Sequence, residues 1–160
     1  MSDKWIELLK GTQEIFDIMG VNLIFWSKIK GFSDYLNEKA SEGCLIRVLI
    51  ADKNHPLSNH LADYNSPEVS HDDMVGNMHS RVHYFNSFPE KHSNIQFKQL
   101  KKGCMHFQIC RTDDQITFIQ YMYSQKTSHC PLWQFSRKAN EHIYKLMNEE
   151  FNELWELNDE

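Results

Sequence analysis

The first part of the chain switches between helical and strand-like patterns of apolar residues. Apolar positions within residues 5–19 recur at helical spacing, which predicts an amphipathic helix that Gly20 ends. The apolar runs 21–26 and 45–51 are short and nearly continuous, as is typical of strands that are covered on both faces. Between them, residues 32–40 again have helical spacing. A strand, a helix and a strand joined by short links predict a parallel β-α-β unit.

A polar loop and a third helix follow. Residues 53–66 are mostly polar and contain Pro56, and they come directly after the second predicted strand. In open α/β sheets, the loops at the carboxyl ends of the strands are where ligands usually bind. Apolar positions then recur over residues 69–88, and Pro89 ends the predicted helix.

The last third of the chain is rich in strand-forming residues and finishes with a helix. The patterns predict four strands and a helix, over residues 95–100, 105–112, 116–123, 132–135 and 143–155. The polar turn formed by Asp113, Asp114 and Gln115 joins the second and third of these strands into a hairpin. The whole pattern predicts one α/β domain over residues 1–160, with a mixed sheet flanked by helices in the order α-β-α-β-α-β-β-β-β-α.

Composition and charge restrict the cellular compartment and the classes of binding partner that we expect. A formal net charge of −5 argues against broad, nonspecific binding to nucleic acid, which needs a large basic surface. The four cysteines include no C-x-x-C pair, and no apolar run is long enough to span a bilayer. The first residues lack the layout of a secretory signal. These features predict a cytoplasmic protein with reduced thiols and no membrane span.

Two segments carry a family resemblance. Residues 50–57, IADKNHPL, match a hydrophobic strand followed by Asp-x-x-x-Pro-Leu. In the predicted hairpin, His106, Gln108 and Asp113 stand at the spacings of a His-x-Lys-x4-Asp motif. In both segments, and in the order of elements over nearly the whole chain, the sequence resembles phospholipase D-like domains, in particular uncharacterised bacterial relatives that lack the full motif. The resemblance implies that His106 would attack a phosphodiester and that Asp113 would orient its histidine.

The motif departs from that of the enzymes in ways that weaken catalysis. Gln108 stands in place of the lysine, so a positive charge that would stabilise the phosphate oxygens is missing. Only one motif is present, whereas the enzymes use two, so a second would have to come from another copy in a homodimer. The sequence therefore predicts a regulatory module that binds a phosphate-containing small molecule, such as a nucleotide, or a nucleic-acid end. The alternatives are a homodimeric phosphodiesterase or nuclease with His106 as nucleophile, and a protein-interaction domain of a bacterial signalling or defence system.

The residues predicted to contact the ligand lie mostly on the hairpin. A period of two places His106 and Gln108 on one face of a strand, with Phe107 and Ile109 on the other. The full set of predicted ligand-binding residues is His106, Gln108, Arg111, Tyr121, Lys126, His79 and His83.

Histidines and lysines outside the hairpin leave further options open. His79 and His83 lie four residues apart on the third predicted helix, a spacing that allows both to bind one metal. If the fold brings His79, His83 and His106 together, the three rings would hold a phosphate when protonated. No second pair of ligands has zinc-site spacing, so no metal and no other cofactor is predicted. Two interpretations apply to the basic residues that flank the hairpin, Lys98, Lys101, Lys102 and Arg111. They supply the charge that the hairpin lacks, or they protect a strand edge from pairing with another chain.

Overall fold

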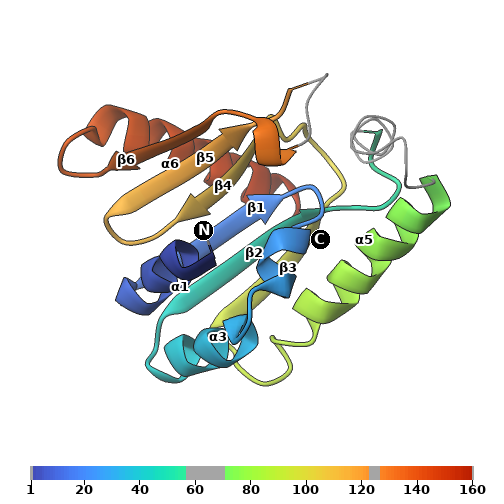
Figure 1. Ribbon diagram of the computed structural model, residues 1–160, viewed down its shortest axis with the longest axis horizontal. Coiled ribbons are helices and arrows are strands. Elements are labelled where there is room, and N and C mark those ends of the chain that lie inside the picture. The colour runs from blue at the N-terminus through green and yellow to red at the C-terminus, as the bar shows by residue number, and fades with distance from the viewer. Residues whose placement is uncertain (1, 57–70, 123–126, 160) are drawn as a thin grey trace.

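The computed structural model describes residues 2–56, 71–122 and 127–159. Its centre is a six-stranded sheet with the strand order β3-β2-β1-β4-β5-β6 (Figure 1). The strands are β1 (Ile15–Gly20), β2 (Leu45–Ala51), β3 (Ile95–Leu100), β4 (Phe107–Arg111), β5 (Gln115–Gln120) and β6 (Leu132–Ser136). The helices are α1 (Ser2–Gly11), α2 (Ile24–Lys28), α3 (Phe32–Ser41), α5 (His71–Asn86) and α6 (Glu141–Leu157), and a short 3-10 helix, η1 (Thr127–His129), precedes β6.

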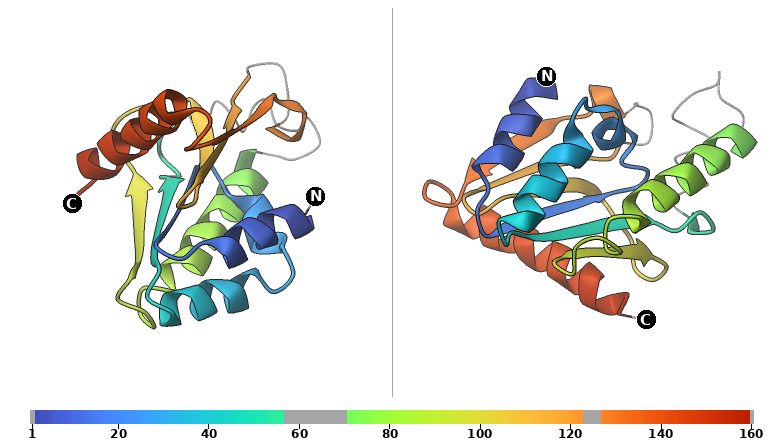
Figure 2. Two further views of the ribbon diagram at one scale, coloured as in Figure 1. Left: turned by 90° about the vertical axis from the view of Figure 1, so that its left-hand side faces the viewer. Right: turned by 90° about the horizontal axis from the view of Figure 1, so that it is seen from below.

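The sheet is mixed and is flanked by helices, as the sequence predicted. Strands β1, β2 and β3 are parallel to one another, whereas the pairs β1–β4, β4–β5 and β5–β6 are antiparallel. The predicted hairpin and last strand are present, and the last strand lies at one edge of the sheet. A parallel connection to β2 is also present, but its first strand is β1 at residues 15–20 rather than the predicted run 21–26. Helix α6 covers one face, and α1, α2, α3 and α5 cover the other, so the molecule has three layers (Figure 2).

Alternation along the strands divides the core into two parts. Phe16 and Ile18 of β1 pack on the side of α1, α2 and α3, together with the fully buried Trp26. Met19 of β1 and Ile109 of β4 pack on the side of α6. Successive side chains of a strand point to opposite faces, so the central strands need apolar residues on both.

The structure differs from the prediction over residues 12–28. Helix α1 ends at Gly11, residues 15–20 form a strand rather than the end of a helix, and residues 24–28 form a helix rather than a strand. Gly20 is therefore the last residue of β1 and does not end a helix. Because β1 is buried on both faces, its apolar residues fit the period of a helix as well as that of a strand, and pairing with β2 and β4 decides the outcome.

Some predictions fall partly outside the described residues. The predicted loop 53–66 and the predicted helix start at 69 do so, whereas α5 runs from His71 to Asn86 and ends before Pro89. No helix in the described ranges combines the length and apolarity that a bilayer span requires. No disulfide joins the cysteines, and burial raises the pKa of Cys44 to about 11.

Candidate functional site

The predicted hairpin histidine lies at the rim of the sheet. His106 precedes β4, its side chain is exposed, and its carbonyl oxygen accepts a hydrogen bond from the backbone N–H of Tyr121 at 3.1 Å. Gln108 is half-buried, and a Cβ built on Gly20 would lie 3.2 Å from its Cγ. Ile109, next along β4, is buried on the opposite face beneath α6. In the described part of the chain, no ion pair joins His106 to a carboxylate, and no cationic side chain bonds to Gln108.

Tyr121 is bonded to the backbone at the same rim. Its hydroxyl oxygen accepts a hydrogen bond from the backbone N–H of Val21 at 3.0 Å, directly after β1 ends. Burial of the phenol raises its pKa, so the group stays protonated and neutral at physiological pH. Tyr121 therefore ties the end of β1 to the hairpin and brings no charge to the rim.

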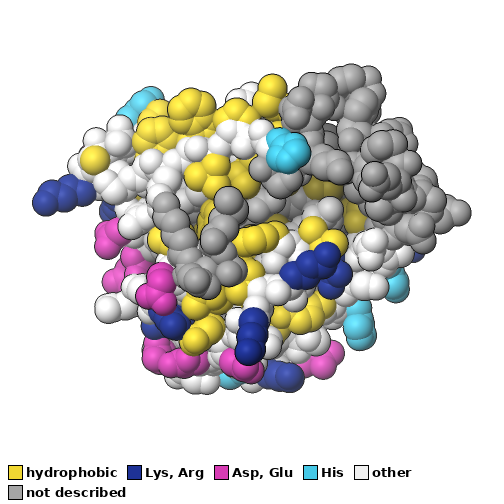
Figure 3. All heavy atoms as spheres, viewed as in Figure 1, with side chains coloured by type: hydrophobic (Ala, Val, Ile, Leu, Met, Phe, Trp, Pro, Cys, Tyr) yellow, Lys and Arg dark blue, Asp and Glu magenta, His cyan; other side chains and the backbone are white. Residues whose placement is uncertain are grey.

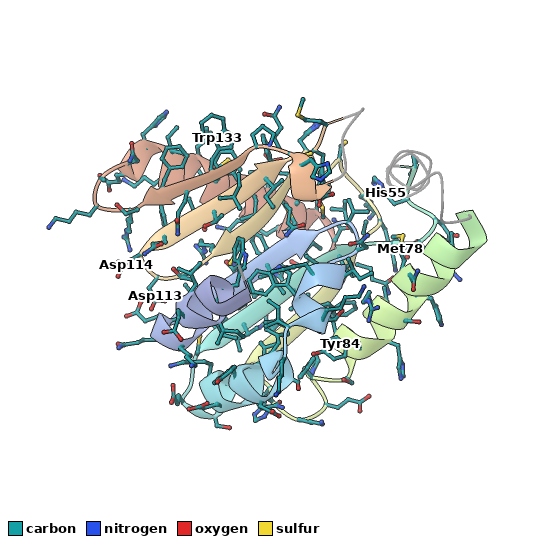
Figure 4. All side chains as sticks on the ribbon, in the orientation of Figure 1. His55, Met78, Tyr84, Asp113, Asp114 and Trp133 are labelled. Carbon is teal, nitrogen blue, oxygen red and sulfur yellow. The ribbon has the colours of Figure 1, made fainter. Side chains whose placement is uncertain are left out.

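The structure does not bring Asp113 to His106. Figure 4 shows Asp113 at the turn of the hairpin, whereas His106 precedes β4 at the strand's other end, so roughly 17 Å of strand separates the two. The Asp113 carboxylate accepts hydrogen bonds from the backbone N–H groups of Gln13 at 2.7 Å, Glu14 at 3.1 Å and Ile15 at 2.8 Å. Asp113 thus fixes the chain where it enters β1, far from the imidazole.

Arg111 belongs to a buried ion-pair network that the sequence patterns did not predict. The side chain of Asp17 in β1 is fully buried, and its carboxylate pairs with Arg111 Nη2 at 2.6 Å and with Arg47 Nε at 2.8 Å. On α6, Asn148 accepts a hydrogen bond from Arg111, and Asn152 accepts one from Arg47. The network lies between the sheet and α6, so Arg111 is not placed beside the hairpin histidine. The sequence signal for this network is a single charged residue within an otherwise apolar run, which is Asp17 in residues 15–20 and Arg47 in residues 45–51.

The remaining predicted residues do not join the hairpin either. His79 and His83 are exposed on α5, and no hydrogen bond or ion pair connects either ring to His106. Across the ranges that the structure describes, no group of three or more His, Cys, Asp or Glu side chains is arranged to hold a metal ion. Lys126 lies outside the described residues.

A polar pocket of about 200 Å³ lies at the opposite edge of the sheet, along β3. We call it the lysine pocket. Its polar lining consists of Lys98, Lys101, Lys102, Asn86, Gln99 and Asn158, and Phe97 and Leu157 supply apolar surface. These residues come from the end of α5, from β3 and the loop after it, and from the end of α6.

The loop after β3, which contains Lys101, Lys102 and Gly103, is held against the end of α6 by the side chain of Asn158. The Asn158 carbonyl oxygen accepts the backbone N–H groups of Lys101 at 2.8 Å and Lys102 at 3.0 Å. The Asn158 amide nitrogen donates to the carbonyl oxygens of Lys102 at 3.1 Å and Leu154 at 2.8 Å. Gly103 closes the loop at φ +90°, and a Cβ there would come within 2.7 Å of Leu154. The loop is therefore positioned before any ligand arrives, which lowers the entropic cost of binding.

Lys98 is anchored to the last turn of α6. Its ammonium group donates to the carbonyl oxygen of Trp155 at 3.0 Å and lies 4.3 Å from the centre of the Trp155 ring. It also pairs with the Asp159 carboxylate. A cation at this place interacts favourably with the negative end of the helix dipole.

The lysine pocket is suited to binding an anion and not to attacking one. Ammonium groups and side-chain amides are hydrogen-bond donors, and charge-assisted bonds to phosphate are the stronger kind. Among the described residues, its lining contains no Ser, Thr, Cys, His, Asp or Glu, so the lysine amines are the only lining groups of a kind that acts as nucleophile or general base. On the face that Figure 3 shows, where α1, α3 and α5 lie, Lys and Arg side chains are interspersed with Asp, Glu and apolar groups rather than gathered into one patch.

Comparison with known proteins yields similarity in structure only. No family model matches the chain, and no curated protein matches it in sequence. The solved structure of TrmBL2, an archaeal chromatin protein described as showing a novel mode of DNA binding, is similar over 98% of this chain with a TM-score of 0.61 and 12% identity. This chain spans about half of that protein, 48% of its length. At this identity the likeness shows a shared fold.

A second solved structure is less similar. It is the phosphatidylserine synthase of Haemophilus influenzae Rd KW20, which matches 73% of this chain and 25% of its own, with a TM-score of 0.39 and 15% identity. At that TM-score the similarity supports no conclusion about activity.

Proposed function

We propose that this chain is a module of phospholipase D-like fold that binds phosphate-containing ligands without cleaving them. The lysine pocket carries the proposal, because three lysines and the side-chain amides of Asn86 and Gln99 line a cavity that holds no hydroxyl, thiol, imidazole or carboxylate among its lining groups. The ligand class is the one that the sequence predicted, but the site differs. It lies at the β3 edge of the sheet rather than on the β4–β5 hairpin.

The hairpin lacks the partners that catalysis by His106 would need. Gln108 brings no charge, Arg111 is paired beneath α6, and Asp113 holds the start of β1. Loss of one group that stabilises the developing charge on a reacting oxygen commonly costs about 3–4 kcal/mol of transition-state stabilisation. A histidine that lacks these partners is a weak nucleophile for a phosphodiester.

The size of the pocket and the net charge of the chain favour a ligand that presents only a few phosphate groups. A cavity of about 200 Å³ has room for a phosphate group and a small attached part, which fits the phosphate end of a nucleotide or of a nucleic acid. A net charge of −5 disfavours a long duplex, which is bound through many phosphate contacts. TrmBL2, which shares the fold, is described as binding DNA, and a nucleic-acid end would be the corresponding ligand here.

Isothermal titration calorimetry with inorganic pyrophosphate, AMP and a 5′-phosphorylated dinucleotide tests the proposal. We expect binding, and we expect Lys101→Ala to weaken it by about five- to ten-fold, as for one charge-assisted contact worth ~1–1.4 kcal/mol. Lys138→Ala is the matched control, because Lys138 is exposed in the turn after β6 at the far edge of the sheet. Absence of binding to all three ligands, or equal effects of the two substitutions, would contradict the proposal.

One observation favours the hydrolase alternative. The imidazole of His106 is exposed at the rim of the sheet, where a second copy of the chain has room to approach it. Hydrolysis of bis(p-nitrophenyl) phosphate by the wild type and by His106→Ala separates the two hypotheses. We expect no rate that depends on His106. A rate that the substitution abolishes, while binding of pyrophosphate stays intact, would establish the enzyme instead.

We also propose that the chain forms the homodimer predicted from the sequence, through the outer edge of β6. This strand carries no charged residue, and Leu132 and Trp133 expose 46% and 48% of their surface. Edge strands that stay unpaired usually carry lysine, as Lys98 does on β3 at the other edge.

A further inference from the structure

We propose that Asp159 is an internal competitor for the lysine pocket, so that the ligand must displace its carboxylate from Lys98. This inference rests on the proposed function of the pocket. The Asp159 carboxylate pairs with the ammonium group of Lys98, and Lys98 lines the pocket. Asp159 is not itself a lining residue, so its carboxylate takes from beside the pocket a Lys98 donor that a phosphate oxygen would otherwise bind.

The contacts of Lys98 divide into fixed and exchangeable ones. The carbonyl oxygen of Trp155 and the ring of the same residue hold the ammonium group in place whether or not the carboxylate is present. An ammonium group has three donors, so the bond to Asp159 uses a donor that positioning does not require. Loss of that carboxylate would leave the lysine in its position and make a donor accessible to another anion.

The exposure of the two partners favours exchange. The Lys98 side chain is 18% exposed, whereas that of Asp159 is 67% exposed. A carboxylate in contact with water is stabilised little by its ion pair and is rehydrated at small cost when it leaves. A phosphate that carries more charge and also meets Lys101 competes effectively for the same donor.

The sequence offers a matched control for the charge alone. Glu156 is exposed in the last turn of α6, three residues before Asp159, and among the described residues it forms no ion pair. Glu156→Gln and Asp159→Asn change the net charge of the protein equally. Only the second substitution removes the carboxylate that contacts Lys98.

The experiment measures inorganic pyrophosphate binding by calorimetry for the wild type, Asp159→Asn and Glu156→Gln. We expect Asp159→Asn to bind about three- to five-fold more tightly, the effect of one exposed ion pair, and Glu156→Gln to bind like the wild type. Binding by Asp159→Asn alone would support the inference as well. If the wild type binds and Asp159→Asn binds no tighter, or if both variants tighten equally, Asp159 is not a competitor and the pocket remains the ligand site.

Failure of the underlying function gives a different result. If neither the wild type nor Asp159→Asn binds pyrophosphate, the pocket is not an anion site and the inference falls with it. Thermal unfolding of both variants serves as the folding check. We expect their unfolding temperatures to match that of the wild type, because both carboxylates are exposed.

Discussion

At the scale of single residues, the charges beneath α6 are balanced incompletely. Asp17 contacts Arg47 and Arg111, so the three groups together hold one net positive charge between the sheet and the helix. The guanidinium of Arg47 also lies 4.7 Å from the centre of the Phe151 ring, and this contact offsets part of the cost of desolvating the cation. The stability of the network therefore depends on the single carboxylate.

Removing that carboxylate is expected to destabilise the fold strongly. Asp17→Asn leaves two buried guanidinium groups without a counter-charge, and breaking a buried pair in this way typically costs about 3–5 kcal/mol. The free energy of unfolding in urea measures the effect. Asp34→Asn, at an exposed position in the first turn of α3, is the control and should change stability by less than about 0.5 kcal/mol. A loss below about 1 kcal/mol in Asp17→Asn would show that the network is not needed for folding.

At the scale of elements, the hairpin turn and the start of β1 form one unit. Asp113→Ala removes the acceptor of three backbone N–H groups, and we expect a loss of about 1–3 kcal/mol of stability, measured by urea denaturation. Asp114, at the next position, has an exposed side chain, so Asp114→Ala should leave the free energy of unfolding nearly unchanged. Unchanged stability in Asp113→Ala, together with loss of a phosphodiesterase activity, would instead indicate the catalytic role that the motif spacing implied.

The end of α6 and the loop after β3 form a second unit, which Asn158 joins. Asn158→Ala removes four hydrogen bonds to the backbone of this unit. We expect pyrophosphate affinity to fall several-fold although every lysine remains, because the loop loses its fixed position. Calorimetry measures the change, with Glu153→Ala on an exposed part of α6 as control. Affinity like that of the wild type would mean that the lysines act independently of the loop geometry.

How far the sequence predicts these elements depends on the type of burial. Residues 45–51 and the β4–β5 hairpin follow from the apolar run and the turn residues, because local pattern and tertiary environment agree there. Residues 15–20 do not, because a strand buried on both faces has no distinguishing period. The sequence identified only part of the lysine pocket. Lys98, Lys101 and Lys102 stand out as a basic group, but no local pattern shows that Asn158 contacts the loop that contains them. Pairing between segments more than 50 residues apart is a tertiary property.

At the scale of the whole molecule, the two edges of the sheet differ in character. The β3 edge carries lysines and polar amides, whereas the β6 edge carries an uncharged strand with exposed Leu132 and Trp133. A ligand site at one edge and an association surface at the other would not compete for space. This arrangement predicts that oligomeric state and ligand binding vary independently.

Light scattering coupled to size-exclusion chromatography tests the association surface. We expect the wild type to elute as a dimer and Trp133→Lys as a monomer, because a lysine on an edge strand must be desolvated before another chain can pair there. Leu157→Lys is the matched control, since Leu157 is also 48% exposed but lines the lysine pocket at the other edge. That variant should remain dimeric. A wild type that is monomeric at all concentrations tested would contradict the homodimer. A dimer that Leu157→Lys disrupts and Trp133→Lys does not would place the interface elsewhere. Both outcomes leave the ligand-binding proposal unaffected.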